Sequence, residues 1–194
     1  MLLLREPPPA ALDAFLAAQA KLGFTYPAVG ATAAAPPPGY AVDRTRVRLG
    51  EGEDTFRAGR AALECWDQFR LGWVRPYPGD TPLLAGGVVA IVARVLGVWW
   101  ANACRVVYVV DEDGPVCRFG FAYGTLPGHA ESGEERFLVE WDRADDSVWY
   151  DVLAFSRPRH PLARLGYPLT RRTQRRFARD SAAAMLRAVR PPPS

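Results

Sequence analysis

The sequence predicts an α+β fold in which helices pack on one face of an antiparallel sheet. About five segments with β-type alternation follow one another between residues 86 and 156, and turns such as DEDGP and DRADD separate them at hairpin spacing. A strand and a helical pattern precede this run, and a long helical pattern follows it. Because helices and strands are segregated along the chain, an alternating α/β fold is not expected.

The first elements are a short helix and an irregular connection. Residues 10–22 have an amphipathic helical pattern that ends at Gly23. Residues 24–40, FTYPAVGATAAAPPPGY, are rich in Pro, Gly and Ala, so we expect an extended segment that packs on the body through Phe24, Tyr26 and Val29. Residues 40–49 alternate as a strand. Residues 53–73 have helical periodicity, with a buried stripe of Phe56, Leu63, Trp66 and Phe69.

The second half of the chain supplies the meander and the last helix. The expected strands are residues 86–95, 100–112, 117–124, 134–141 and 147–156. A final helix is expected from about Leu162 to Val189. We expect a single domain over residues 1–194, in which about 1–39 pack on a core of about 40–190. A strongly curved sheet that grips the last helix would leave a cavity between them.

Composition and charge are those of an ordinary soluble globular protein, with 49% hydrophobic and 23% charged residues and a net charge of +3. This charge is too small to indicate a nucleic-acid partner. The chain has 23 Arg and one Lys, a skew typical of genome-wide codon bias, so arginine abundance is weak evidence for anion binding. The odd number of cysteines, Cys65, Cys104 and Cys117, favours reduced thiols in a cytoplasmic protein.

Known cofactor and targeting signals are missing from the sequence. There is no glycine-rich phosphate loop, nucleophile elbow or metal-ligand spacing, so we expect no cofactor and no metal. The apolar stretch 83–104 contains Arg94 and paired glycines, which indicates two strands rather than a transmembrane segment. The apolar run at the start stops after four residues, so we expect no signal peptide.

Four segments carry a family resemblance: FTYPAVGAT, CRVVYVVDE, GFAYGTLPGHAESGEERF and AFSRP. Together they resemble the family called domain of unknown function 1990, over nearly the whole chain. This resemblance implies no particular activity. The element order is also similar to the helix-grip fold of START domains, polyketide cyclases and Bet v 1 allergens, in topology rather than in motifs. Those relatives mostly hold hydrophobic ligands between the sheet and the C-terminal helix.

Strand parity predicts that one acid points into the interior. Phe119, Phe121 and Tyr123 share a face of their strand, and Glu135, Phe137, Val139 and Trp141 share a face of the next. If the aromatic faces coincide, Glu135 lies beside Tyr123, where a carboxylate needs a partner or a proton. Arg105 is a candidate partner, because apolar residues flank it. Such a pair could orient the polar end of a ligand, or it could simply hold the hairpin together.

The expected ligand-binding residues are Tyr123, Glu135, Arg105, Phe121, Trp141 and Phe177. The aromatic strands either line a cavity or fill a core, and the sequence is consistent with both. In the stretch 121–137, the side chains of His129, Glu131, Glu134 and Glu135 could supply a general acid and base, with His129 titrating near neutral pH. The alternative is an ordinary solvated connection between two strands.

The last helix carries a basic face made of Arg171, Arg172, Arg175, Arg176 and Arg179, opposite Thr173, Phe177 and Ser181. This face could bind RNA, DNA or anionic lipid. Because no aromatic residues are interleaved for base stacking, a solvated face is the preferred interpretation and nucleic acid is not expected.

The preferred functional hypothesis is therefore the binding of an apolar or aromatic small molecule between the sheet and the C-terminal helix. The first alternative is an enzyme of cyclase, hydratase or hydrolase type that uses Glu135 and Tyr123, with His129 on a lid. A carboxylate with a raised pKa in a reachable cleft would favour that alternative. The second alternative is a basic module that binds nucleic acid or anionic lipid. The sequence does not select an oligomeric state.

Overall fold

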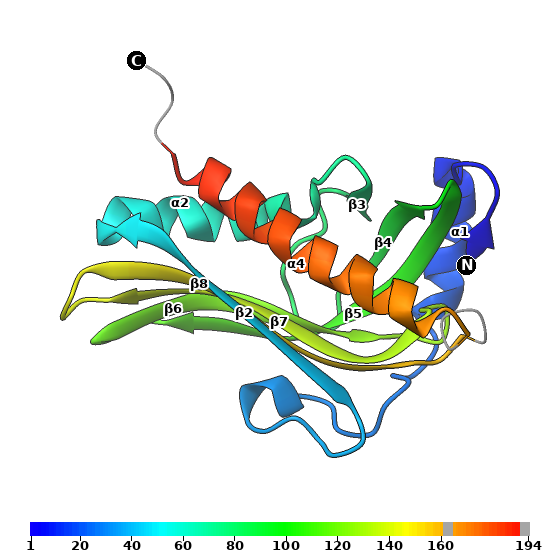
Figure 1. The fold of residues 1–194 in the computed structure, drawn as a ribbon, viewed down its shortest axis with the longest axis horizontal. Helices are drawn as coiled ribbons and strands as arrows, with labels where there is room; N and C mark the ends of the chain where they lie inside the picture. Colours follow the sequence, from blue (N-terminus) through cyan, green and yellow to red (C-terminus); the bar gives the residue numbers. More distant parts are fainter. Residues whose placement is uncertain (161–164, 191–194) are drawn as a thin grey trace.

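The main feature of the computed structural model, which describes residues 1–160 and 165–190, is one strongly curved antiparallel sheet (Figure 1). The strands are β1 (Leu2–Leu3), β2 (Ala41–Glu51), β3 (Val74–Tyr77), β4 (Val88–Val95), β5 (Val98–Glu112), β6 (Val116–Thr125), β7 (Glu131–Asp142) and β8 (Ser147–Pro158). Their order is β2-β8-β7-β6-β5-β4-β3, and β1 pairs with β5. The edges of the sheet are thus β2 and β3.

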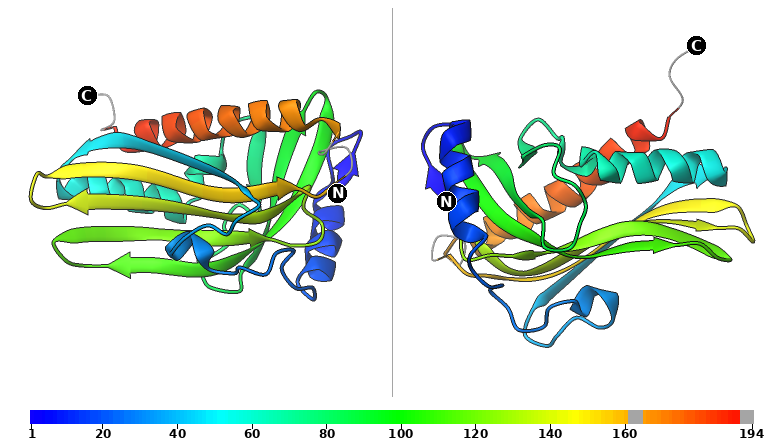
Figure 2. Two further views of the ribbon diagram at one scale, coloured as in Figure 1. Left: turned by 60° about the horizontal axis from the view of Figure 1, so that its bottom comes forward. Right: turned by 180° about the vertical axis from the view of Figure 1, so that it is seen from behind.

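The helices are α1 (Pro9–Gln19), α2 (Gly52–Glu64) and α4 (Tyr167–Ala188), with the short 3-10 turns η1 (Ala31–Ala33) and η2 (Asp67–Phe69). The long helix α4 lies across the concave face of the sheet, and α2 lies beside it on the same face (Figures 1 and 2). This is the helix-grip arrangement that the element order predicts. None of the helices in the described part of the chain combines the length and apolar character needed to cross a membrane.

All five strands of the predicted meander are confirmed, whereas β1 and β3 were not predicted from the sequence. Strand β3 lies in the breaker-rich segment RPYPGDTP and tolerates Pro76 because it is an edge strand. The predicted helix over 53–73 is wrong in its second half, since α2 ends at Glu64. The backbone turns at Trp66, which has a left-handed φ of 58°, and thereby directs both Trp66 and Phe69 into the core. The predicted start of the last helix, at about 162, lies outside the described residues.

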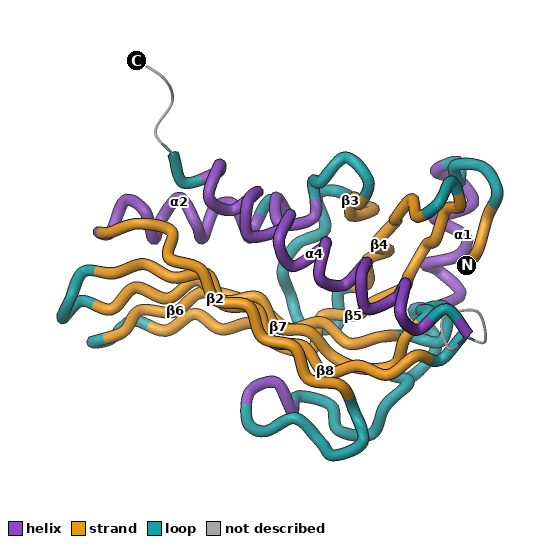
Figure 3. The backbone as a smooth tube through the Cα atoms, viewed as in Figure 1, coloured by secondary structure: helices purple, strands orange, loops and turns teal. Residues whose placement is uncertain are grey.

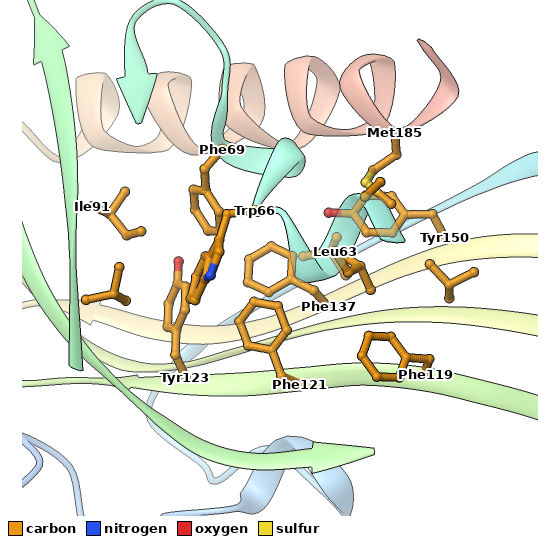
Figure 4. Packing of buried hydrophobic residues seen from close by; sticks show 14 of the residues in the cluster. Leu63, Trp66, Phe69, Ile91, Phe119, Phe121, Tyr123, Phe137, Tyr150 and Met185 are labelled. Atoms are coloured by element: carbon orange, nitrogen blue, oxygen red, sulfur yellow. The ribbon is translucent and has the colours of Figure 1, made fainter. Parts of the chain in front are cut away.

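The core lies between the concave face of the sheet and the helices (Figure 4). Its largest fully buried side chains include Trp66, Phe69, Phe121, Phe137 and Tyr150. These rings meet edge to face or tilted, as in the pair of Trp66 and Phe121 with centroids 4.9 Å apart. The C-terminal half of α4 is fixed in this layer, because Met185 is fully buried and Ser181 Oγ lies 2.8 Å from Tyr150 Oη. Under this half of α4 the space is filled.

Residues 24–33, here called the N-terminal segment, lie on the opposite, convex face of the sheet (Figure 3). Its anchor is the Glu134 side chain, which accepts hydrogen bonds from Tyr26 Oη, Gly30 N, Thr32 N and Thr32 Oγ1 at 2.5–2.9 Å. Gly124 makes this contact possible, because a Cβ at that position would lie only 2.0 Å from Tyr26 Oη. These hydrogen bonds therefore fix residues 24–33 to β7.

Candidate functional site

A cavity of about 360 Å³ lies between the concave face of the sheet and the N-terminal half of α4. Its walls come from strands β2 to β8, η2 and α4, and apolar atoms make up most of their surface. The apolar lining residues are Phe69, Trp73, Val74, Ile91, Ala93, Val152, Ala154, Phe155, Phe177 and Ala178. This volume lies within the range of small-molecule sites. The two alternatives for the aromatic strands thus both occur, a filled core at one end of α4 and a cavity at the other.

Glu135 and Tyr123 form the polar pair of the cavity. They are direct cross-strand partners, with Phe121 opposite Phe137 as the next inward pair, so the predicted parity is confirmed. Tyr123 Oη donates a hydrogen bond of 2.7 Å to Glu135 Oε2. Both side chains line the cavity. Among the described residues, this is the only hydrogen bond that the Glu135 carboxylate accepts.

The surroundings of Glu135 favour its protonated form. Burial raises the pKa of this carboxyl to about 7, and the negative charges of Glu131 and Asp43 act in the same direction, while the Tyr123 hydrogen bond opposes them. Burial and the Glu135 charge raise the pKa of the Tyr123 phenol well above its ordinary value. Near neutral pH the pair therefore holds a neutral phenol and a carboxyl group that can either give or take a proton.

A polar rim ties the start of α4 to the sheet above this pair. Gln174 Nε2 donates to Glu131 Oε1 at 2.6 Å and to Ser156 Oγ at 3.1 Å. Arg171 binds both carboxylate oxygens of Asp43 on β2 at 2.5 Å. Burial raises the pKa of the Glu131 carboxyl, and Gln174 lowers it in part. Neither Gln174 nor Asp43 is among the site residues predicted from the sequence.

His129 lines the cavity, but the expectation that it titrates near neutral pH is wrong. Burial and the nearby Met1 ammonium group lower the pKa of the imidazole to about 3. Its Nδ1 accepts a hydrogen bond from Glu131 N at 2.9 Å, as expected for a neutral ring. The connection is half-buried, and two of its amides are bonded to side chains, Gly128 N to Gln19 Oε1 and Ala130 N to Asn102 Oδ1. His129 is therefore a neutral wall residue.

Of the expected ligand-binding residues, Tyr123, Glu135 and Phe177 line the cavity, whereas Arg105, Phe121 and Trp141 do not. The predicted pairing of Arg105 with Glu135 is wrong. Arg105 is paired in register with Gly124, one residue out of phase with Tyr123, and so lies on the convex face. There it donates to Ala20 O at 2.7 Å and lies over the ring of Phe24.

Phe121 and Trp141 lie away from the cavity, Phe121 in the core and Trp141 further along the sheet. Phe121 is fully buried, and Trp66 packs against it. Trp141 packs against Phe56 of α2, at the end of the sheet where the core is filled. Glu134, expected with the possible acid and base groups, holds the N-terminal segment from the convex face.

The described residues hold no group of three or more His, Cys, Asp or Glu side chains arranged for a metal ion. Cys104 and Cys117 are buried free thiols and Cys65 is exposed. Burial raises the pKa of Cys104 well above its ordinary value, so this thiol, which lies near Glu135, stays protonated. Glu135 and Tyr123 can supply proton transfer and hydrogen bonding in the cavity.

The family model described as Domain of unknown function (DUF1990) matches residues 25–184. The chain belongs to this family. The DUF1990 chain is 40% identical over 200 residues to a UPF0548 protein of Deinococcus radiodurans, covering 97% of this chain and 99% of that protein. It is 42% identical over 159 residues to a UPF0548 protein of Dictyostelium discoideum, covering 77% of this chain and 73% of that protein.

Solved structures similar to the DUF1990 chain are more distant. The hypothetical protein jhp0584 of Helicobacter pylori has a TM-score of 0.49 and 12% identity, covering 84% of this chain and 95% of that chain. Ara h 8.0201 has a TM-score of 0.45 and 10% identity, covering 76% of this chain and 99% of that chain. Human STARD10 has a TM-score of 0.45 and 11% identity, covering 95% of this chain and 80% of that chain.

Proposed function

We propose that this DUF1990 protein binds an apolar or aromatic small molecule in the cavity between the sheet and α4. The observation that supports the proposal is the cavity itself, which combines apolar walls with the hydrogen-bonded pair of Tyr123 and Glu135 and a polar rim. An apolar cavity with a few placed polar groups is the usual form of a small-molecule site, since apolar walls supply affinity and polar groups fix orientation.

The size of the cavity limits the ligand. A volume of about 360 Å³ corresponds to roughly a dozen water molecules at about 30 Å³ each. This space suits one aromatic ring system or a short alkyl chain with a polar end. The rings of Phe69 and Phe177 stack with centroids 5.2 Å apart and offer a flat apolar wall for it. The ligand would direct its polar end toward Glu135 and its apolar part toward this wall.

The first test is native mass spectrometry of protein purified from its own host, followed by denaturing extraction of anything released. A stoichiometric apolar compound would support the proposal and identify the ligand. In parallel, N-phenyl-1-naphthylamine, whose fluorescence rises in apolar surroundings, serves as a probe for the purified protein. We expect saturable binding by the wild type.

A blocking variant makes this test specific. Ala154→Phe fills the cavity from β8, so we expect the probe to lose at least tenfold in affinity. Ala61→Phe on the exposed face of α2 is the matched control and should bind as the wild type does. Equal binding by wild type and Ala154→Phe would mean that the probe binds elsewhere, and the proposal would be wrong.

A second candidate function is proton-transfer catalysis in the same cavity. The observation that favours it is Glu135, whose pKa of about 7 suits a general base at neutral pH. The test incubates host metabolite extract with the wild type and with Glu135→Gln, and compares the compounds consumed. Consumption by the wild type alone would support an enzyme, whereas identical extracts would leave binding as the function.

The basic face of α4 gives less support to a nucleic-acid or lipid module. Arg171 is bound to Asp43, Arg176 lies over Trp73 and contacts Asp180, and Arg179 also contacts Asp180. These contacts neutralise much of the charge that such a module would use. The buried free thiols of Cys104 and Cys117 support a cytoplasmic setting for the proposed binding.

A further inference from the structure

The cavity holds more acidic groups than its cationic groups neutralise. We propose that its ligand carries a positively charged nitrogen, an amine or ammonium group, on the apolar or aromatic body. This inference rests on the proposed binding function and specifies the chemical class of the ligand.

Four acidic residues line the cavity, Asp43 on β2 and Glu131, Glu134 and Glu135 on β7. The Glu134 carboxylate is turned to the convex face and bound there by Tyr26 and Thr32, which leaves the carboxyl groups of Asp43, Glu131 and Glu135. Of these three, only Asp43 forms an ion pair with an arginine in the described part of the chain, and that arginine is Arg171. The partner of Glu131 is the neutral amide of Gln174, and the partner of Glu135 is the Tyr123 hydroxyl.

The other two arginines that line the cavity do not neutralise Glu135. Arg44 directs its guanidinium to the buried carboxylate of Asp151 on the convex face. Arg175 lies exposed at the rim on α4. No arginine appears among the charges that shift the pKa of Glu135. Among the described residues, the carboxyl groups of Glu131 and Glu135 therefore face the cavity without an arginine bonded to either of them.

Glu135 also has room for a further hydrogen-bond donor. Tyr123 bonds Oε2, while Oε1 accepts no hydrogen bond from the described residues. A carboxylate away from bulk water needs a cation or a proton. An ammonium group supplies both charge and N–H donors, so it would complete the site while Glu135 stays ionised. A carboxylate or phosphate ligand would instead place like charges together.

The aromatic walls suit a cation as well. Phe69, Phe177 and Tyr123 line the same space, and the faces of such rings attract ammonium groups. Aromatic surfaces combined with acidic groups are a common way to hold amines, because the rings contact the apolar stem and the positive nitrogen together.

The charge of the ligand determines how its affinity depends on pH. The titratable and charged groups that surround Glu135 are Tyr123, Cys104, Tyr150, Glu131, Asp43 and Arg171. The pKa of Glu135 itself lies at about 7. A cationic ligand favours the ionised carboxylate, so its affinity should rise with pH through about 7 and binding should release a proton. A neutral ligand that accepts a hydrogen bond from protonated Glu135 would show the opposite trend.

The experiment is isothermal titration calorimetry with three probes of similar shape, 4-phenylbutylamine, 4-phenylbutan-1-ol and 4-phenylbutyrate, at pH 6 and pH 8. We expect the amine to bind about tenfold or more tightly than the alcohol at pH 8, and the butyrate to bind weakest. The amine should bind more tightly at pH 8 than at pH 6. Equal or tighter binding by the alcohol or the butyrate would overturn the inference.

Two variants assign the effect to one side chain. Glu135→Gln keeps the shape of the side chain but removes its charge, so amine affinity should fall about tenfold at pH 8 and alcohol affinity should change much less. The matched control is Glu140→Gln, on the same strand but bonded to Arg46 and Arg118 on the convex face, and it should bind as the wild type does. An amine that binds Glu135→Gln as well as the wild type would contradict the inference.

These outcomes separate the two proposals. Alcohol binding that Ala154→Phe abolishes, with no advantage for the amine, would keep the binding function and overturn the cationic ligand. If none of the three probes binds the wild type, both proposals are wrong for ligands of this size.

Discussion

Glu134 and Glu135 are neighbours in the sequence, yet they lie on opposite faces of β7 and have very different surroundings. Glu134 accepts four hydrogen bonds from the N-terminal segment, whereas Glu135 accepts one and faces the cavity. The alternation of a strand alone places them this way. A structural acid and a candidate site acid can therefore be distinguished by their partners and not by residue type.

The raised pKa of Glu135 predicts a pH dependence of stability. The carboxyl titrates near 7 in the folded protein and near its ordinary 4.5 when unfolded, so the folded state binds more protons between these values. The free energy of unfolding should therefore fall as pH rises from about 4.5 to 7, by up to about 3 kcal/mol. Urea unfolding at pH 5 and pH 8 measures this loss.

In Glu135→Gln, the free energy of unfolding should fall much less between pH 5 and pH 8 than in the wild type, because the amide does not titrate. Glu140→Gln is again the control and should keep the pH dependence of the wild type. An unchanged dependence in Glu135→Gln would show that another group is responsible.

Glu134→Ala should strongly destabilise the protein. The change leaves the buried Tyr26 hydroxyl and the amide groups of Gly30 and Thr32 without their acceptor. We expect a loss of about 3 kcal/mol or more in the free energy of unfolding, measured with urea. Glu64→Ala, which removes an exposed pair with Arg60, should cost less than about 1 kcal/mol. Similar losses of stability for both variants would show that Glu134 does not anchor residues 24–33.

At the scale of elements, the two halves of α4 differ. Ser181 and Met185 fix the C-terminal half in the core. The N-terminal half lies over the cavity and is held by polar contacts of Arg171 and Gln174 and by the stacking of Phe177 on Phe69. Backbone amides in residues 171–177 should therefore exchange with deuterium faster than those in 181–187, as measured by mass spectrometry. A bound ligand should slow deuterium exchange in residues 171–177 only. Uniform exchange along the helix would contradict this difference.

The strands could be predicted from the sequence because alternation repeats every two residues and turn residues mark their ends. The same alternation gave the inward position of Glu135. It did not place Arg105, because the face that a residue occupies depends on register with neighbouring strands, and β5 carries an irregularity between Val106 and Tyr108. The helix over 53–73 was overextended because side-chain periodicity continues through the backbone turn at Trp66.

The cavity was predicted in its location but not in its composition. Its walls combine β2, β7 and α4, which are far apart in the sequence, and contacts such as Gln174 with Glu131 depend on how the helix is seated. Parity within single strands gives no information about such contacts. Aromatic strands likewise do not reveal which rings fill space and which border it, as Phe121 and Tyr123 illustrate.

For the whole molecule, we expect unfolding in one cooperative transition. Residues 24–33 contact the convex face of β7 through Glu134, while α2 and α4 cover the concave face, so the N-terminal segment shares a strand with the core. Differential scanning calorimetry should give equal calorimetric and van't Hoff enthalpies. Two separate transitions would show that the N-terminal segment is an independent unit.

The sheet stays open because α4 occupies its concave face, and an open sheet leaves edge strands to which another chain could add. Strand β3 is short and contains Pro76, which has no N–H to offer such a chain. Strand β2 carries the exposed arginines Arg44, Arg46 and Arg48 along its length. Two copies paired along β2 would bring their arginines close together, and the like charges would repel. Both edge strands of this open sheet, β2 and β3, therefore disfavour aggregation.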